Sequence, residues 1–122
     1  MIKHNILIVD DEKDIIDLLS YNLKKNDFNV ISANNGKEAL LKLNNSIDLI
    51  ILDIMMPEMD GYETCKSIKS KTEFKNIPIF FLTAKSTTDD EFKGLKIGAE
   101  DYIKKPISIK NLILRINNLF KR

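Results

Sequence analysis

The sequence predicts an α/β fold in which helices cover both faces of a five-stranded parallel sheet. Short runs rich in Ile, Val, Leu and Phe alternate with longer amphipathic stretches along the 122 residues. This alternation favours buried parallel strands, because parallel neighbours need helical crossovers between them. A chain of this length can bury a substantial core, and no linker or low-complexity stretch divides it. We therefore expect one domain that spans residues 1–122.

The first half of the chain contains the segments expected to form strands one to three. The apolar run 5–9 is the first strand, and residues 28–33 are the second. Between them, a helix is expected from about Lys13 to Lys25. Its inner face would consist of apolar residues spaced by three or four positions: Ile15, Leu18, Leu19 and Leu23. The turn 34–36 leads to a second helix, which carries Ala39, Leu40 and Leu43. The third strand, 49–52, stops at Asp53.

The second half repeats the pattern twice. Pro57 and Asp60-Gly61 break the chain before a third helix, which carries Tyr62, Cys65 and Ile68. The fourth strand is the run 77–82. The helix after it passes through Phe92 and Leu95 and would end at Gly98 in the left-handed conformation. The fifth strand is 101–104. The last helix is expected to bury one face: Ile109, Leu112, Ile113, Ile116 and Phe120.

Composition excludes several classes of protein. The formal net charge is +1, and Lys and Arg are interspersed with Asp and Glu, so no overall attraction to nucleic acid or to an acidic membrane is expected. The single cysteine, Cys65, excludes an internal disulfide. No stretch resembles a signal peptide or a membrane span. We expect a cytoplasmic protein that does not contact membranes.

Polar residues follow the apolar runs at the points where the predicted strands end. Asp10 and Asp11 follow the first strand, Asp53 the third, Thr83 the fourth and Lys105 the fifth. The carboxyl ends of parallel strands meet at one edge of a sheet, and ligands of open α/β sheets bind there. Three carboxylates, a hydroxyl and an ammonium are therefore expected to converge in a reactive site.

This set of side chains favours phosphoryl chemistry with a hard metal ion. Gathered carboxylates repel one another unless a cation neutralises them, and oxygen ligands without His or Cys suit Mg²⁺. The Lys105 ammonium and the Thr83 hydroxyl suit the oxygens of a phosphoryl group. Since no Ser, Cys or His is placed as a nucleophile, a carboxylate itself would attack and form an acyl phosphate. Asp53, at the end of the central strand, is the candidate.

The ordered motifs resemble a bacterial response-regulator receiver domain over essentially the whole chain. They are Asp10-Asp11, the segment 53–61, Thr83-Ala84 and the segment 98–106. The resemblance implies a flavodoxin-like, CheY-like (βα)5 fold with strand order 2-1-3-4-5. It also implies a function in two-component signalling: phosphoryl transfer from the phosphohistidine of a sensor histidine kinase to Asp53. Such a domain is a phosphoacceptor switch that catalyses only its own phosphorylation and dephosphorylation.

The same resemblance implies a role for each site residue. Asp53 would be the phosphoacceptor, Asp11 a direct Mg²⁺ ligand, Asp10 a ligand through water, and the backbone carbonyl of Met55 a further ligand. Lys105 would contact the phosphoryl oxygens, and its bond to Pro106 is expected to be cis. Thr83 would donate its hydroxyl and move inward, and Tyr102 would be the aromatic switch that fills the space left behind. Together these residues form a two-state element biased by a covalent charge.

The segments 94–103 and 119–122 resemble receivers of the OmpR/PhoB type. That resemblance implies a DNA-binding domain after this chain, regulation of transcription, and dimerisation on phosphorylation. The residues expected at the dimer interface are Phe92, Leu95, Glu100, Asp101, Leu114, Arg115 and Arg122. Two ion pairs across that face would join Asp101 to Arg115 and Glu100 to Arg122. A third pair is lost, because its positions hold Glu91 and Asn111.

Simpler interpretations remain open for individual residues. Asp11 could cap the first helix, and Lys105 could be an ordinary solvated lysine. Tyr102 could be a half-buried aromatic without a switching role. Phe92 and Leu95 could belong to the core. His4 is expected at the surface, and Cys65 as a small packing residue.

Three other functions are compatible with parts of the pattern. A flavin mononucleotide binder has the same fold but needs a phosphate-cradling loop after the first strand, where this chain has acidic residues. A phosphatase of the haloacid dehalogenase type would place its nucleophile after the first strand and carry a cap insertion. Finally, a stand-alone single-domain response regulator would act through protein contacts without a DNA-binding domain.

Overall fold

Five parallel strands form one sheet with the order β2-β1-β3-β4-β5 in the computed structural model, which describes residues 3–84 and 97–122. The strands are β1 (Asn5–Val9), β2 (Asn29–Ala33), β3 (Leu49–Asp53), β4 (Ile79–Thr83) and β5 (Asp101–Lys104). The helices are α1 (Lys13–Lys25), α2 (Gly36–Lys42), α3 (Gly61–Lys69) and α5 (Ile109–Phe120). The predicted helix through Phe92 and Leu95 lies outside the described residues. The doubly wound fold and its strand order are confirmed.

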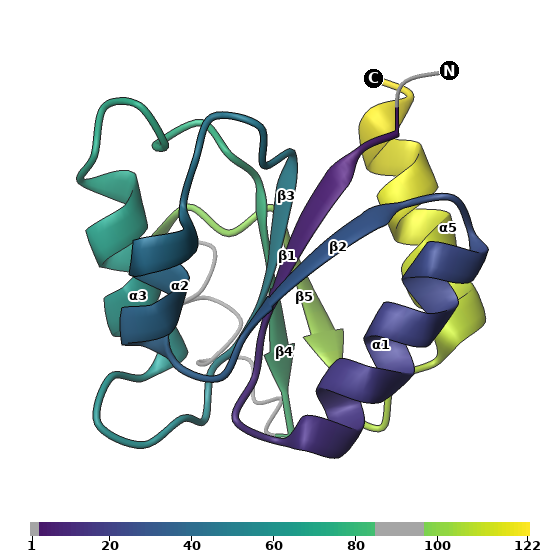
Figure 1. Ribbon diagram of the computed structural model, residues 1–122, viewed down its shortest axis with the longest axis horizontal. Coiled ribbons are helices and arrows are strands. Elements are labelled where there is room, and N and C mark those ends of the chain that lie inside the picture. Colours follow the sequence, from purple (N-terminus) through teal and green to yellow (C-terminus); the bar gives the residue numbers. More distant parts are fainter. Residues whose placement is uncertain (1–2, 85–96) are drawn as a thin grey trace.

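Helices cover the sheet from both sides. Figure 1 shows α2 and α3 against one face and α1 and α5 against the other. The chain first winds outward from β1 to β2 and then returns past β1 to β3. The direction of winding therefore reverses between β1 and β3, which is the point where open α/β sheets form a ligand crevice.

Burial on both faces explains why the central strands are continuous apolar runs. In β1, Leu7 and Val9 face the core on the α2–α3 side, while Ile6 and Ile8 face the core on the α1–α5 side. Every residue of β3 and β4 is buried in the same alternating way. A strand with period-two side chains needs apolar residues at every position when both faces are covered.

The inner face of α1 differs from the prediction by a small rotation. Ile16, Leu19 and Leu23 are its buried residues, whereas Leu18 is 44% exposed and Ile15 is partly buried. Positions 16, 19 and 23 share a stripe at helical spacing, and Leu18 lies to one side of it. The prediction of Leu18 as a core residue was wrong. The first turns of α1 carry apolar residues on two neighbouring faces, and either face could have been the buried one.

Helix and strand ends follow local chemistry. Asn35 caps α2, and its side chain accepts a hydrogen bond from the Glu38 N–H at 2.8 Å. The N-cap of α1 is Glu12, not Asp11, and its side chain makes no capping bond. Gly98 has a φ of +105°, which glycine adopts without strain. Strand β4 begins two residues later than predicted.

Among the described helices, none has the length and the apolar sequence needed to cross a membrane.

Candidate functional site

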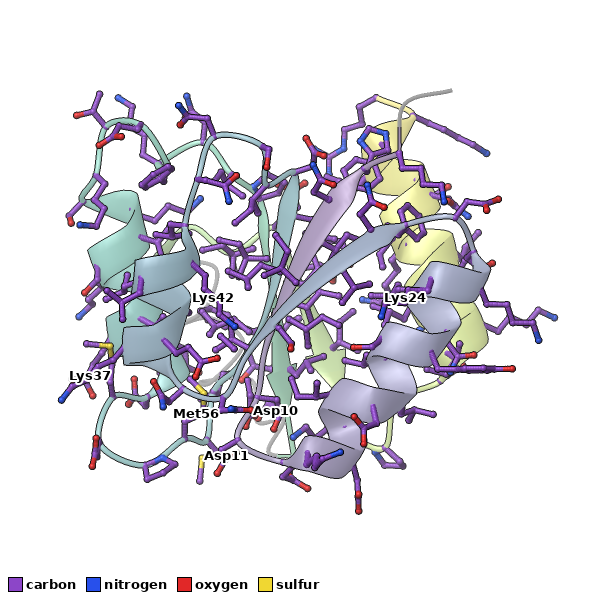
Figure 2. The ribbon with its side chains drawn as sticks, in the orientation of Figure 1. Asp10, Asp11, Lys24, Lys37, Lys42 and Met56 are labelled. Carbon is purple, nitrogen blue, oxygen red and sulfur yellow. The ribbon has the colours of Figure 1, made fainter. Side chains whose placement is uncertain are left out.

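Three of the predicted site residues meet at the carboxyl edge of the sheet. Asp10 follows β1, Asp53 ends β3, and Lys105 follows β5. The Lys105 Nζ lies 3.1 Å from the Asp10 Oδ2 and 3.5 Å from the Asp53 Oδ1. Figure 2 shows Asp10 and Asp11 at the lower end of the strands, away from both chain ends. The topology thus brings together one ammonium and two carboxylates that are separated by up to 95 positions in the sequence.

The two carboxylates are buried and only partly satisfied. Asp10 and Asp53 are at most 1% exposed. The Asp10 Oδ1 accepts a bond from the Glu12 N–H at 2.9 Å, and the Asp53 Oδ1 accepts a longer one from the Met55 N–H at 3.4 Å. Within the described residues, the Oδ2 atoms of Asp10 and Asp53 have no hydrogen-bond partner, although the Asp10 Oδ2 keeps its ion pair with Lys105. A buried oxygen left in this state carries a free-energy cost that a bound cation would remove.

Burial raises the pKa of both carboxyl groups, and the charge of Asp10 raises that of Asp53 further. Burial is the main cause at Asp53, followed by the charge of Asp10, and together they raise the pKa of Asp53 to about 7 despite the Lys105 ammonium. Burial also raises the pKa of Asp10. Burial alone would lower the pKa of Lys105, but the charges of Asp53 and Asp10 outweigh it and raise that pKa. The site therefore holds more negative charge than one lysine can neutralise.

The donor set fits a hard divalent cation. Carboxylate oxygens of Asp10, Asp11 and Glu12 lie within 4.8 Å of one another, and Asp11 and Glu12 are exposed to solvent. Asp53 adds a buried oxygen without a hydrogen-bond partner among the described residues. Oxygen ligands and an open, hydrated side are what Mg²⁺ requires. The residues at this edge therefore form an acidic pocket of the kind that binds Mg²⁺.

The loop after β3 is held tightly against the end of its own strand. The Gly61 N–H donates to the Ile54 carbonyl at 2.9 Å, so the segment 54–61 closes on itself. A Cβ added at Gly61 would lie 2.4 Å from the Asp53 carbonyl oxygen, which only glycine avoids. Asp60 and Glu63 then form a reciprocal capping box at the start of α3. Backbone packing thus fixes the position of Asp53.

Thr83 and Tyr102 lie near the same edge. Thr83 ends β4 and is buried, and its carbonyl accepts the Lys105 N–H at 2.7 Å. The Lys105–Pro106 peptide bond is cis. The side chain of Met55 is exposed. Tyr102 is half-buried and packs against the core on the α2–α3 side.

Part of the predicted dimer face can be described. Leu114 is an exposed apolar residue of α5. The Arg115 Nη1 lies 2.7 Å from the Asp101 Oδ1, and Arg122 pairs with Glu100. Both ion pairs form inside the chain, and the pairs expected across the face between two chains stay a prediction. Phe92, Leu95 and Glu91 lie outside the described residues.

Two residues at the site were not assigned a role from the sequence. Glu12 contacts the Lys105 Nζ at 3.2 Å, and its only sequence signal was its position directly after the acid pair. Tyr62 was placed only as a residue on a buried helix face. Its hydroxyl lies 3.3 Å from that of Tyr102. A tyrosine on an apolar stripe is a usable signal, because a buried hydroxyl normally finds a partner.

Comparison with known proteins identifies the family. The sequence profile of the response regulator receiver domain matches residues 6–117. The response regulator SaeR of Staphylococcus aureus is 45% identical over 118 residues, which are 97% of this chain and 51% of SaeR. The chain thus spans about half the length of the curated relatives it matches.

Solved structures agree. The receiver domain of the Francisella response regulator 1452 has a TM-score of 0.89 and 36% identity, with 98% of both chains covered. Thermotoga maritima DrrB, an OmpR/PhoB homologue, has a TM-score of 0.88 and 29% identity over 99% of this chain and 54% of DrrB. The BeF3-activated DrrB receiver domain has a TM-score of 0.90 at the same identity, with 99% and 100% covered. The carboxylates and the lysine at the sheet edge, the strand order and the matched sequence agree: this chain belongs to the response-regulator receiver-domain family.

Proposed function

We propose that this chain accepts a phosphoryl group on Asp53 from the phosphohistidine of a sensor histidine kinase and thereby switches between two states. One observation carries the proposal: Asp53 is a buried carboxylate with one oxygen lacking a hydrogen-bond partner among the described residues, next to an ammonium and an acidic pocket. Such a carboxylate is a poor structural element, because its burial costs free energy. It is well placed as a nucleophile that gains stabilisation when its charge is neutralised or transferred.

The transfer is a simple exchange of bonds. An Asp53 carboxylate oxygen attacks phosphorus, the P–N bond of the phosphohistidine breaks, and its electron pair returns to the imidazole of the kinase. Lys105 would pair with the phosphoryl oxygens, and the Thr83 hydroxyl would donate to them. Other nucleophiles are poorly placed. Cys65 is buried with a pKa raised to about 11, mainly by burial. His4 directly precedes β1, at the amino edge of the sheet, and stacks on Phe120.

Mg²⁺ would be held by Asp10, Asp11, Asp53 and the carbonyl of Met55. When bound, it neutralises the gathered carboxylates and screens the phosphoryl oxygens as the donor approaches. The chain's own contribution is to keep these ligands preorganised. Asp10 is fixed by the Glu12 N–H and Lys105, and Asp53 by the closed loop that ends at Gly61. The domain itself keeps the transferred phosphoryl group, so it acts as a switch.

Two states and an output surface complete the proposal. Movement of Thr83 and Tyr102 would report phosphorylation to the face that carries Asp101, Leu114 and Arg115. Asp101 and Arg115 are paired within one chain. On dimerisation, each would either keep this partner or pair with the corresponding residue of the second chain. Exposed Leu114 supplies apolar surface for a two-fold contact. Phe92 and Leu95 would complete the interface.

The similarity to SaeR and DrrB supports a regulator of transcription with a DNA-binding domain after the receiver. The chain covers 51% of SaeR and 54% of DrrB, so each relative has room for a second domain. A stand-alone regulator that acts through protein contacts is the alternative. The length of the gene product decides between them.

The central test is chemical labelling of Asp53. Incubation with Mg²⁺ and acetyl phosphate should add one phosphoryl group, which hydroxylamine removes because it is an acyl phosphate. Intact mass spectrometry should show the addition in the wild type and its loss in Asp53→Asn. Asp17→Asn is a matched control, because Asp17 is an exposed carboxylate on α1. Full labelling of Asp53→Asn would refute the assignment, and labelling that is equal with EDTA would refute the role of Mg²⁺.

A further inference from the structure

A hydrogen bond between two tyrosine hydroxyls connects the loop after Asp53 to the last strand of the sheet. Tyr62 is the second residue of α3 and Tyr102 lies in β5, and their hydroxyl oxygens are 3.3 Å apart. The ring of Phe81 in β4 makes edge contacts with both, with centroids 5.3 Å from Tyr62 and 6.2 Å from Tyr102. We call these three residues the tyrosine cluster.

Tyr62 is the fixed member of the tyrosine cluster. It is buried, and it directly follows Gly61, whose N–H donates to the Ile54 carbonyl. A Cβ at Gly61 would lie 2.4 Å from the Asp53 carbonyl oxygen. The capping box of Asp60 and Glu63 holds the same helical turn. The position of the Tyr62 hydroxyl is therefore tied to the backbone that carries Asp53.

Tyr102 is the member with room to move. It lies in β5, which pairs with β4 and is last in the order of the described strands, and it is half-buried. It also lines a hollow of about 450 Å³ together with Pro106, Asn111 and Arg115. Tyr102 thus borders both the packed aromatic side, at Phe81, and the hollow. A hydrogen bond on the packed side biases it toward that side.

We propose that the Tyr62 hydroxyl is a positioning group that holds Tyr102 packed against Phe81 and out of the hollow. Tyr62 thereby links the Asp53 loop to β5 by a route separate from Thr83. The link between packing and activation rests on the proposed function, in which Tyr102 must lie inward. The net strength of such a hydrogen bond corresponds to roughly a two- to tenfold change in the ratio of the two positions.

The chain is well suited to a direct test, because it contains three tyrosines and no tryptophan. With 3-fluorotyrosine incorporated, fluorine NMR should give one resonance for each tyrosine. Tyr21, on α1 and 66% exposed, is the solvent reference. Broadening by a soluble gadolinium chelate then reports the exposure of the Tyr102 ring. Tyr62→Phe removes only the hydroxyl and keeps the ring that packs on Phe81.

We expect Tyr62→Phe to increase the broadening of the Tyr102 resonance about two- to tenfold, toward the broadening of the Tyr21 resonance. The control variant Tyr21→Phe should leave the broadening of the Tyr102 resonance unchanged. The concentration of beryllofluoride needed to activate the variant should rise by a similar factor, because Tyr102 spends less time packed. An unchanged Tyr102 resonance, an unchanged beryllofluoride requirement, or an equal effect of Tyr21→Phe would overturn the inference. A wild-type chain that beryllofluoride does not activate at any concentration would instead count against the proposed function.

Discussion

The polar residues at the two edges of the sheet differ in how fully they are hydrogen-bonded. At the amino edge, Asp48 accepts the Asn5 N–H at 2.7 Å and lies 3.7 Å from the His4 Nδ1. The Asn5 side chain donates to the Ser46 carbonyl and accepts from the Asn29 side chain, at 2.8 and 2.9 Å. At the carboxyl edge, Asp10 and Asp53 are buried deeper but keep oxygens without hydrogen-bond partners among the described residues. The same strands thus run from a satisfied edge to an unsatisfied one.

This difference separates structural polar groups from functional ones. The network at the amino edge fixes the register of β1 against β2 and of the loop before β3, and it needs no outside partner. The carboxyl edge keeps buried carboxylate oxygens without hydrogen-bond partners among the described residues, and the pKa of Asp53 is raised mainly by burial. A sequence that keeps such a cost in an otherwise consistent fold does so for function. The comparison predicts opposite responses to mutation at the two edges.

The largest expected effect concerns the backbone that holds the carboxyl edge rigid. In Gly61→Ala the new Cβ would lie 2.4 Å from the Asp53 carbonyl oxygen and 2.7 Å from the Ile54 Cα, so backbone must shift. We expect the free energy of unfolding to fall by about 3 kcal/mol, as measured by urea denaturation. Labelling by acetyl phosphate should slow as well, because Asp53 is displaced.

Lys66→Ala is the control for that experiment. Lys66 is exposed on the same helix, so its truncation should change the free energy of unfolding only slightly. A Gly61→Ala protein with the stability and labelling rate of the wild type would show that the tight loop is not what positions Asp53.

A second effect, of intermediate size and opposite sign, concerns the charge at Asp53. Since burial raises the pKa of Asp53 in the folded chain to about 7 from its ordinary value of 3.8, the folded chain binds the proton more tightly than the unfolded chain. This contribution to stability is complete below about pH 4 and is lost as the pH rises through about 7. In EDTA at pH 8, Asp53→Asn should therefore be more stable than the wild type by on the order of 2 kcal/mol.

The difference between variant and wild type should shrink as the pH falls from 8 to 5, because Asp53 then becomes protonated. Urea denaturation at several pH values measures it, with Asp17→Asn as the control for an exposed carboxylate. Mg²⁺ should stabilise the wild type more than the variant at pH 8. A stability difference that does not vary with pH would mean that Asp53 is not protonated in this range.

Most of the fold could be predicted because the sequence pattern and the topology reinforce each other. Continuous apolar runs such as β3 indicate burial on both faces, and the strand ends then place Asp10, Asp53 and Lys105 together. The rotation of α1 could not be predicted, because Ile15, Ile16, Leu18 and Leu19 offer two stripes and only packing selects one.

The finer features of the site depend on contacts between distant elements. The side chain of Glu12 contacts that of Lys105, 93 positions later in the sequence, and Tyr62 contacts Tyr102, 40 positions later. Periodicity gives the face of an element but not the partner on another element. The ion pair of Asp101 with Arg115 was expected from the family resemblance, but a sequence cannot tell whether such a pair forms within one chain or between two. These contacts needed three-dimensional geometry.

The smallest expected effect tests the satisfied edge. Asp48→Ala removes the acceptor of the Asn5 N–H and the partner of His4. It leaves the register of β1 supported by backbone bonds and by the two bonds of the Asn5 side chain. Because the Asp48 side chain is 40% exposed, water can replace part of what is lost. We expect the free energy of unfolding to fall by about 1 kcal/mol, with labelling at Asp53 unchanged. Urea denaturation and mass spectrometry on the same samples measure both. A variant as stable as the wild type would show that the bonds of Asp48 contribute nothing to stability, and the contrast between the two edges would then rest on the carboxyl edge alone.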